Sequence, residues 1–214
     1  MRKIDLMVFD FDGTLVHSGG DLANSVNYAL EKLGIPVLAT GTIMGFVGDG
    51  VMKLIERSLG EQHRERFDEA MNIFRDHYAQ HLLDTTALYP GVTDVLEHFS
   101  GTTKLIITNK LYEYTLKIAE ALGIAPCFEE IIGMDSLPRK KPDRELLVPL
   151  MDRYGAGESR TVVIGDGIND ILLARNSGAL SCALLNGLGA RDVLLSLKPD
   201  YRCEDIGELK DLFE

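Results

Sequence analysis

Short apolar runs alternate with helical patterns along most of this chain, and no other feature of the sequence constrains the fold as strongly. The segments between the runs carry apolar residues at the spacing that places them on one face of a helix. Buried strands separated by helices are typical of a parallel sheet with helices on both faces. The sequence therefore predicts an α/β fold, with strands at Ile4–Phe9, Thr103–Thr108, Glu130–Gly133, Thr161–Gly165 and Ala179–Leu184.

The segment between the first two runs breaks this rhythm. From Asp21 to about Leu83 the patterns are helical throughout, with turn residues at Gly19-Gly20 before them and Pro90-Gly91 after them. A crossover between neighbouring parallel strands needs only about a dozen residues, far fewer than this segment contains. We therefore expect an all-helical cap subdomain at residues 17–84, inserted into a Rossmann-like core of residues 1–16 and 85–214. It would lie over the end of the first strand as a lid.

Charge and composition exclude several classes of protein. A net charge of −11 argues against nucleic-acid binding and against an anionic membrane surface as partner. No apolar run approaches the roughly 20 residues that span a bilayer. Three widely spaced cysteines predict neither a disulfide framework nor a zinc site. The N-terminal residues enter a strand-like run rather than a signal-peptide pattern, so we expect a cytoplasmic protein, monomeric or homodimeric.

The first apolar run ends in two acids, Asp10 and Asp12, within the segment Val8–Leu15. In open α/β sheets, ligands bind in the crevice beyond the carboxyl ends of the strands. Two like charges one residue apart repel each other unless a cation joins them or one of them is protonated. The pair therefore suggests a metal ion together with a proton-transfer role.

Polar residues also follow two later parts of the predicted sheet. Thr108 and Asn109 come directly after a strand and offer neutral donors for a phosphoryl oxygen, although Thr-Asn is also a common turn. Lys141 lies in the basic loop Arg139–Asp143, before Pro142. This lysine either neutralises charge among the acidic strand ends or belongs to a solvated loop in which Asp143 caps the next helix.

A further buried run, Thr161–Gly165, ends in Asp166, and Asp170 follows one helical turn later. Two carboxylates at the start of a helix suit a hard ion such as Mg²⁺. The alternative is that either acid only caps the helix. Along the chain, four strand ends offer in turn two acids, a hydroxyl–amide pair, a lysine and two further acids. If these residues served the structure alone, their occurrence at four strand ends would require four separate coincidences.

These motifs in this order resemble the haloacid dehalogenase-like superfamily of hydrolases. Within it, the chain is similar to the phosphoglycolate phosphatase group, which has a helical cap inserted after the first motif. The resemblance covers nearly the whole chain. The motifs that carry it are Asp10-x-Asp12-Gly13-Thr14-Leu15, Thr108-Asn109-Lys110, Lys141-Pro142 and Gly165-Asp166-x-x-x-Asp170, with Gly48-Asp49-Gly50 in the cap and Tyr89-Pro90-Gly91-Val92 before the second motif.

The resemblance implies a role for each matching residue. Asp10 matches the nucleophile that forms an aspartyl-phosphate, and Asp12 matches the general acid/base, whose backbone carbonyl binds the metal. Lys141 matches the lysine that steadies the nucleophile. The phosphate holders would be Thr108 and Asn109, the metal ligands Asp10, Asp12, Asp166 and Asp170, the cofactor Mg²⁺, and the substrate-binding residues Gly13, Thr14, Lys110, Gly48 and Gly50.

The expected function is a magnesium-dependent phosphatase acting on a small phosphorylated metabolite, phosphoglycolate or a similar phosphomonoester. A phosphomutase of the β-phosphoglucomutase type is the nearest alternative, followed by pyrophosphatase or nucleotidase activity. A dehalogenase is disfavoured because that chemistry needs no counterpart of Asp12. A non-catalytic protein is disfavoured because no catalytic position is missing. Met44 stands where some phosphoglycolate phosphatases carry arginine, which weakens the assignment to phosphoglycolate.

Overall fold

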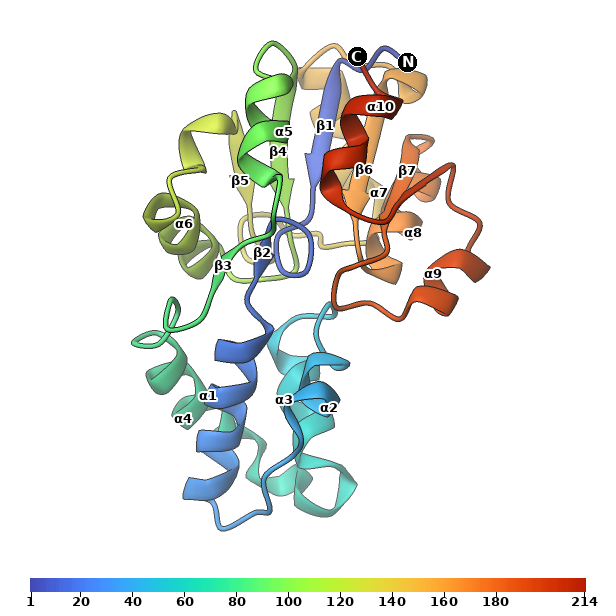
Figure 1. Cartoon of the computed structure of the whole chain (residues 1–214). Helices are drawn as coiled ribbons and strands as arrows, with labels where there is room; N and C mark the ends of the chain where they lie inside the picture. Colours follow the sequence, from blue (N-terminus) through green and yellow to red (C-terminus); the bar gives the residue numbers. More distant parts are fainter.

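The computed structural model describes residues 1–214 and contains one six-stranded sheet in the order β5-β4-β1-β6-β7-β8 (Figure 1). Every neighbouring pair of strands is parallel, which confirms the predicted α/β fold. The five predicted strands are all present, with small shifts at their ends. The strands are β1 (Leu6–Phe9), β4 (Thr103–Ile107), β5 (Glu130–Ile132), β6 (Thr161–Gly165), β7 (Leu180–Leu184) and β8 (Tyr201–Cys203).

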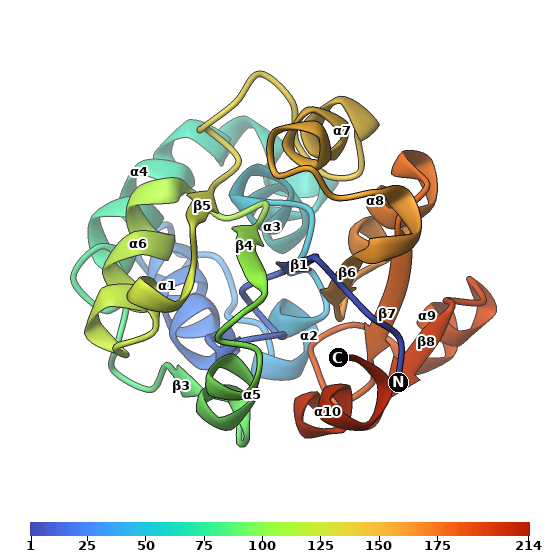
Figure 2. The ribbon, with the colours of Figure 1, turned by 90° about the horizontal axis from the view of Figure 1, so that it is seen from above.

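Both faces of the sheet are covered by helices. Leu6 and Val8 of β1 pack with one set of helices, whereas Met7 and Phe9 point to the opposite face and join the larger core. All four residues of β1 are fully buried, as expected for a central parallel strand. Figure 2 shows α7 (Arg144–Arg153) and α8 (Ile168–Ser177) on one side of the strands, and α5 (Val92–His98) and α10 (Leu209–Leu212) on the other.

Strand β8 was not predicted from the sequence. It has only three residues and lies at the edge of the sheet, where Cys203 is buried and Arg202 is exposed. An edge strand this short contains no apolar run that a sequence pattern could detect. The remaining elements of the core are α6 (Tyr112–Ala121), α9 (Arg191–Ser196) and the short 3₁₀ helices at Ala125–Cys127, Glu158–Arg160 and Ile206–Glu208. None of the helices combines the length and the apolar character needed to cross a membrane.

Between β1 and β4 the chain forms a group of helices beyond the carboxyl ends of the strands (Figure 1). Its helices are α1 (Gly19–Lys32), α2 (Thr40–Met44), α3 (Val51–Leu59) and α4 (Phe67–Tyr78), with a 3₁₀ helix at Glu61–Arg66 before α4. The chain leaves the core through β2 (Val16–His17) and returns through β3 (Ala87–Leu88). These two strands pair antiparallel, so the outgoing and returning segments lie side by side. We call helices α1–α4 and their connections the cap.

Asp21 joins the two segments where they enter the cap. Its carboxylate is fully buried and accepts hydrogen bonds from the backbone N–H and the side-chain hydroxyl of both Thr85 and Thr86, at 2.6–3.0 Å. Burial acts to raise the pKa of Asp21, but these hydrogen bonds outweigh it and hold the pKa below its usual value. The first turn of α1 is thereby fixed to the returning chain just before β3.

Candidate active site

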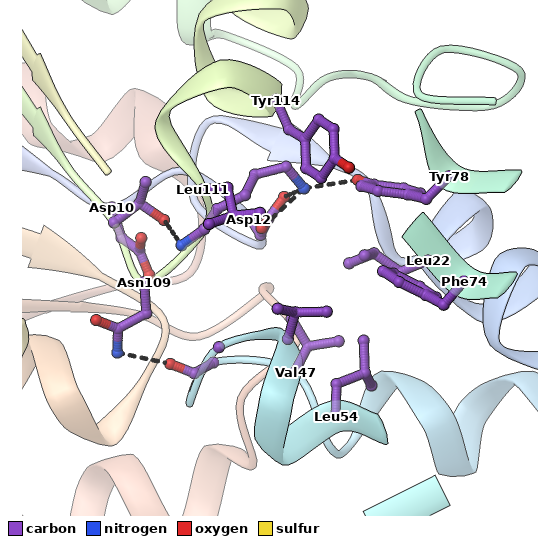
Figure 3. Close-up of a pocket in the computed structure, with 15 residues that line it drawn as sticks. Asp10, Asp12, Leu22, Val47, Leu54, Phe74, Tyr78, Asn109, Leu111 and Tyr114 are labelled. Atoms are coloured by element: carbon purple, nitrogen blue, oxygen red, sulfur yellow. Dashed lines mark hydrogen bonds and ion pairs between the residues drawn. The ribbon is translucent and has the colours of Figure 1, made fainter. Parts of the chain in front are cut away.

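The predicted site residues gather where β1, β4 and β6 end, beside the cap (Figure 3). Asp10 follows β1, Thr108 follows β4 and Asp166 follows β6. Because these strands are parallel neighbours in the sheet, their carboxyl ends lie at the same edge. Strand order alone therefore brings residues far apart in the sequence into one site.

Three acids form a buried cluster at this edge. Ligand atoms of Asp10, Asp166 and Asp170 all lie within 4.8 Å of one another. Burial, and next the nearby charge of Asp10, raise the pKa of both Asp166 and Asp170. Carboxylate oxygens in such a cluster are the ligands that hard divalent cations prefer, and a cation would offset the repulsion between them. The donor set therefore fits a divalent metal ion.

Lys141 supplies a positive charge beside the cluster. Its Nζ lies 2.8 Å from Oδ1 of Asp10 and 2.6 Å from Oδ1 of Asp170, and its side chain is only 2% exposed. Burial acts to lower the pKa of Lys141, but the charges of Asp10 and Asp170 outweigh it and raise the pKa. The solvated-loop alternative is therefore wrong for Lys141. The predicted N-cap is present nevertheless, since Asp143 accepts a hydrogen bond from the N–H of Glu145 at the start of α7.

Asp170 caps the helix in which it lies and also contacts the lysine of the site. Its Oδ2 accepts a hydrogen bond from the backbone N–H of Gly167 at 2.9 Å, which caps the start of α8. Its Oδ1 faces Lys141. The capping contact fixes the carboxylate in the orientation that reaches the lysine.

Asp166 is held from two sides. The hydroxyl of Thr14 donates to its Oδ1 at 2.8 Å, and the backbone N–H groups of Leu188 and Gly189 donate to its Oδ2 at 2.8 and 3.3 Å. Gly13 has a left-handed φ of +87°, and a Cβ at this position would lie 2.1 Å from Oδ2 of Asp166. Gly13 and Thr14, which the sequence suggested as substrate-binding residues, therefore face this carboxylate.

Asp12 lies in different surroundings from Asp10. Its Oδ1 accepts hydrogen bonds from the hydroxyl of Ser18 at 2.5 Å and from Nζ of Lys110 at 3.0 Å. Lys110 also donates to the hydroxyl of Tyr78 on α4 at 2.6 Å (Figure 3). Burial acts to lower the pKa of Lys110, but Asp12, and next Tyr78, outweigh it and raise the pKa. Asp10 thus belongs to the three-acid cluster, whereas Asp12 is held by a lysine that contacts the cap.

A loop of the cap closes over the remaining polar residues. Nδ2 of Asn109 donates to the backbone carbonyl of Gly48 at 3.1 Å, while its buried Oδ1 has no hydrogen-bond partner. On the other side, Nδ2 of Asn169 donates to Oδ1 of Asp49 at 2.8 Å. Thr108 is buried next to Asn109. The loop at residues 48–50 therefore contacts both the end of β4 and the first turn of α8.

A pocket lies between these strand ends and the cap (Figure 3). The predicted site residues that line it are Asp10, Asp12, Thr108, Asn109, Lys110, Gly48 and Gly50. The other lining residues form an apolar wall: Leu22, Val47, Val51, Leu54, Phe74, Tyr78, Leu111 and Tyr114. Lys141, Asp166 and Asp170 lie behind the lining, around Asp10.

Several contacts of the site were not anticipated. Tyr78 belongs to the apolar stripe of a predicted cap helix, and nothing in that stripe indicates a hydroxyl bonded to Lys110. The N–H groups of Leu188 and Gly189 come from the glycine-containing loop after β7, whose only sequence signal is its position after a strand. The contact between Ser18 and Asp12 is local, since the two residues are only six positions apart in the sequence.

Comparisons with known proteins identify a family and several relatives that this chain is similar to. The family described as haloacid dehalogenase-like hydrolase matches residues 7–184. A protein of Vibrio parahaemolyticus named phosphoglycolate phosphatase is 34% identical, over 99% of this chain and 96% of its own length. A protein of the same name from Chromobacterium violaceum is 35% identical, over 100% of this chain and 98% of its own length. The crystal structure of a predicted phosphoglycolate phosphatase from Haemophilus somnus superimposes with a TM-score of 0.92 at 29% identity, covering 99% of each chain.

Proposed function

The chain belongs to the haloacid dehalogenase-like hydrolase family, and from this premise we propose a magnesium-dependent phosphatase that hydrolyses a small phosphomonoester through an aspartyl-phosphate on Asp10. That it is a phosphatase follows from the family and from the relatives named above. One observation carries the finer proposal. The acids Asp10 and Asp12 are two residues apart but have separate partners, so that one is suited to attack and the other to move protons.

Asp10 is the proposed nucleophile. Its Oδ1 accepts a hydrogen bond from the N–H of Phe11 at 2.6 Å and lies 2.8 Å from Nζ of Lys141. These contacts leave Oδ2 free to attack phosphorus. Attack by a carboxylate divides hydrolysis into two easier steps, formation and then hydrolysis of a covalent intermediate. Lys141 keeps Asp10 oriented and balances charge on the phosphoryl group during both steps.

Asp12 is the proposed general acid and base. It gives a proton to the oxygen of the leaving alcohol in the first step and takes one from the attacking water in the second. Ser18 and Lys110 hold its carboxylate at the pocket wall, where the leaving oxygen would lie. The hydroxyl of Thr108 and the amide of Asn109 are the neutral donors that would hold the phosphoryl oxygens.

The acidic cluster is the proposed magnesium site. Asp10, Asp166 and the backbone carbonyl of Asp12 would bind the ion, with Asp170 in support. When bound, Mg²⁺ would supply positive charge to the phosphoryl oxygens. Thr14, Leu188 and Gly189 prepare the site by fixing both oxygens of Asp166.

We also propose that the enzyme works in a reducing compartment such as the cytoplasm, because its three cysteines are free thiols. A phosphomutase remains the rival activity, since it would use the same phosphoenzyme. Product analysis separates the two, because a mutase releases an isomerised sugar phosphate and little free phosphate.

The decisive experiment is a screen for phosphate release from phosphomonoesters with Mg²⁺ present or chelated. The panel includes phosphoglycolate because the relatives carry that name. We expect Asp10→Asn to reduce kcat/KM by at least about a thousandfold, which corresponds to about 4 kcal/mol of barrier. Activity that persists in the purified Asp10→Asn protein would remove the proposed nucleophile.

A further inference from the structure

We propose that the alcohol released by this enzyme is uncharged and carries a branched aliphatic or aromatic group. Phosphomonoesters with a carboxylate beside the phosphoryl group, phosphoglycolate included, are then poor substrates. This inference rests on the proposed function and narrows it from phosphomonoesters in general to one chemical class. It comes from the part of the pocket that lies beyond Asp12, where the leaving alcohol has to fit.

The walls of this part of the pocket are apolar. Leu22 comes from α1, Leu54 from α3 and Phe74 from α4, and all three are buried. Val47 approaches from the cap loop, opposite Leu111 and Tyr114 of the core (Figure 3). A hydrocarbon or aromatic group placed here exchanges water for apolar contacts, which favours binding.

Lys110 is the only cationic residue that lines the pocket, and its ammonium group already has hydrogen-bond partners. Its Nζ lies 3.0 and 3.2 Å from the two carboxylate oxygens of Asp12 and 2.6 Å from the hydroxyl of Tyr78. No arginine or histidine lines the pocket. A carboxylate on the leaving group therefore finds no free cation and must compete with Asp12 for Lys110.

The nucleophile opposes a carboxylate further. Asp10 also lines the pocket, and the carboxylate that attacks phosphorus carries the same sign as the incoming group. Lys141 is on the far side of Asp10, where it contacts Asp10 and Asp170. Moving a carboxylate out of water without a partner is costly, and nearby like charges add to that cost. An uncharged alcohol avoids both penalties.

The test compares two substrates of the same shape. Isobutyl phosphate has the heavy-atom skeleton of phosphoglycolate, with the two carboxylate oxygens replaced by methyl groups. We expect kcat/KM for isobutyl phosphate to exceed that for phosphoglycolate by at least about tenfold, because only the carboxylate must be desolvated without a partner. A ratio below ten overturns the proposal.

A charge introduced into the apolar wall provides a second test. Val47 is half-buried in the cap loop and tolerates a longer side chain better than the buried leucines. Val47→Arg gives the pocket a free cation, and Val47→Met is the matched variant of similar length without charge. Relative to Val47→Met, Val47→Arg should shift the ratio towards phosphoglycolate by at least about tenfold. Equal ratios in the two folded variants contradict the proposal.

The design separates failure of this inference from failure of the proposed function. Every protein is also assayed with para-nitrophenyl phosphate, an activated ester whose aromatic group carries no ionised substituent. No turnover of any ester by the wild type, with Mg²⁺ present, refutes the phosphatase itself. Turnover in which phosphoglycolate is the better of the matched pair refutes only the inference about the leaving group.

Discussion

At the scale of single residues, the site depends on how the two acids of the first motif, separated by a single residue, come to differ. Asp10 points towards the cluster with Asp166 and Asp170, whereas Asp12 points to Ser18 and Lys110. Gly13 follows Asp12 directly with a left-handed φ, and a Cβ at this position would collide with the carboxylate of Asp166. The spacing Asp-x-Asp-Gly is therefore a backbone requirement as well as a chemical one.

Lys110 should matter for the proton that Asp12 delivers. Lys110→Met removes the ammonium group that donates to Asp12 while retaining an unbranched side chain. Asp12 is then held only by the hydroxyl of Ser18. We expect kcat/KM on isobutyl phosphate to fall by about a hundredfold, because general acid catalysis contributes about that much or more. On para-nitrophenyl phosphate, whose leaving group departs without a proton, the loss should be less than about tenfold.

Tyr78→Phe is the companion variant, since it keeps the ring and removes only the hydroxyl that Lys110 contacts. Its kcat/KM should also fall more on isobutyl phosphate than on para-nitrophenyl phosphate, but both losses should be smaller than those of Lys110→Met. If Lys110→Met lost the same factor on both esters, Lys110 would have only a structural role and the positioning of Asp12 would have to come from Ser18.

At the scale of elements, the connection between cap and core is held by the pair β2 and β3 and by Asp21. The two strands contribute only two residues each. Asp21 adds hydrogen bonds to both Thr85 and Thr86 and is fully buried. A buried carboxylate with all its acceptor sites used fixes the angle at which α1 leaves the core.

Asp21→Asn should therefore destabilise the protein. The amide keeps the volume but loses acceptor capacity, which leaves N–H or O–H groups of Thr85 and of the buried Thr86 without a partner. We expect a loss of about 1–3 kcal/mol in the free energy of unfolding at neutral pH, measured by urea denaturation. Asp94→Asn, at an exposed position of α5, is the matched control and should change stability little.

The pH dependence of this difference follows from the lowered pKa of Asp21. The folded state holds the pKa below the unfolded value of 3.8, so the stabilisation is complete above that pH and is lost as the pH falls towards the folded pKa. The difference between wild type and Asp21→Asn should be constant near neutrality and shrink below about pH 4. A difference that does not change down to pH 3 would mean that the carboxylate charge plays no part.

Sequence patterns predicted these elements unequally. The strands before Asp10 and Asp166 are fully buried, and the strand before Thr108 is buried except at its first residue, so their apolar composition identifies them directly. In contrast, β8 and the pair β2 and β3 have two or three residues each and depend on pairing with a neighbour rather than on composition. The role of Asp21 follows from a contact with residues 64 and 65 positions away in the chain, which no local pattern contains.

At the scale of the whole molecule, the pocket exists only because the cap and the core meet. Asp10, Thr108 and Lys110 could be placed together from the sequence, since the carboxyl ends of parallel strands share one edge. Leu54, Phe74 and Tyr78 are indistinguishable from core residues in the sequence, because each lies on an apolar stripe of a helix. Which of them reaches the site depends on how the cap docks, a tertiary property that periodicity does not encode.

The magnesium site should couple metal binding to the stability of the whole fold. The cluster of Asp10, Asp166 and Asp170 exists only when the chain is folded, so an ion that binds it stabilises the folded state. At a concentration 100 times the Kd this stabilisation is about 2.7 kcal/mol, which for a chain of this size corresponds to a rise in Tm of roughly 5–10 °C. The measurement is thermal unfolding of the wild type with Mg²⁺ and with a chelator.

Asp166→Asn should remove most of this Mg²⁺-dependent rise, because it deletes the charge of the acid that Thr14 and Leu188 hold in place. Asp94→Asn, at an exposed position of α5 and not part of the cluster, should retain the full rise and serves as the control for nonspecific ion effects. An equal rise in the wild type and in Asp166→Asn would show that the stabilising ion binds elsewhere. The readout is independent of catalysis, so it tests the metal site whatever the substrate turns out to be.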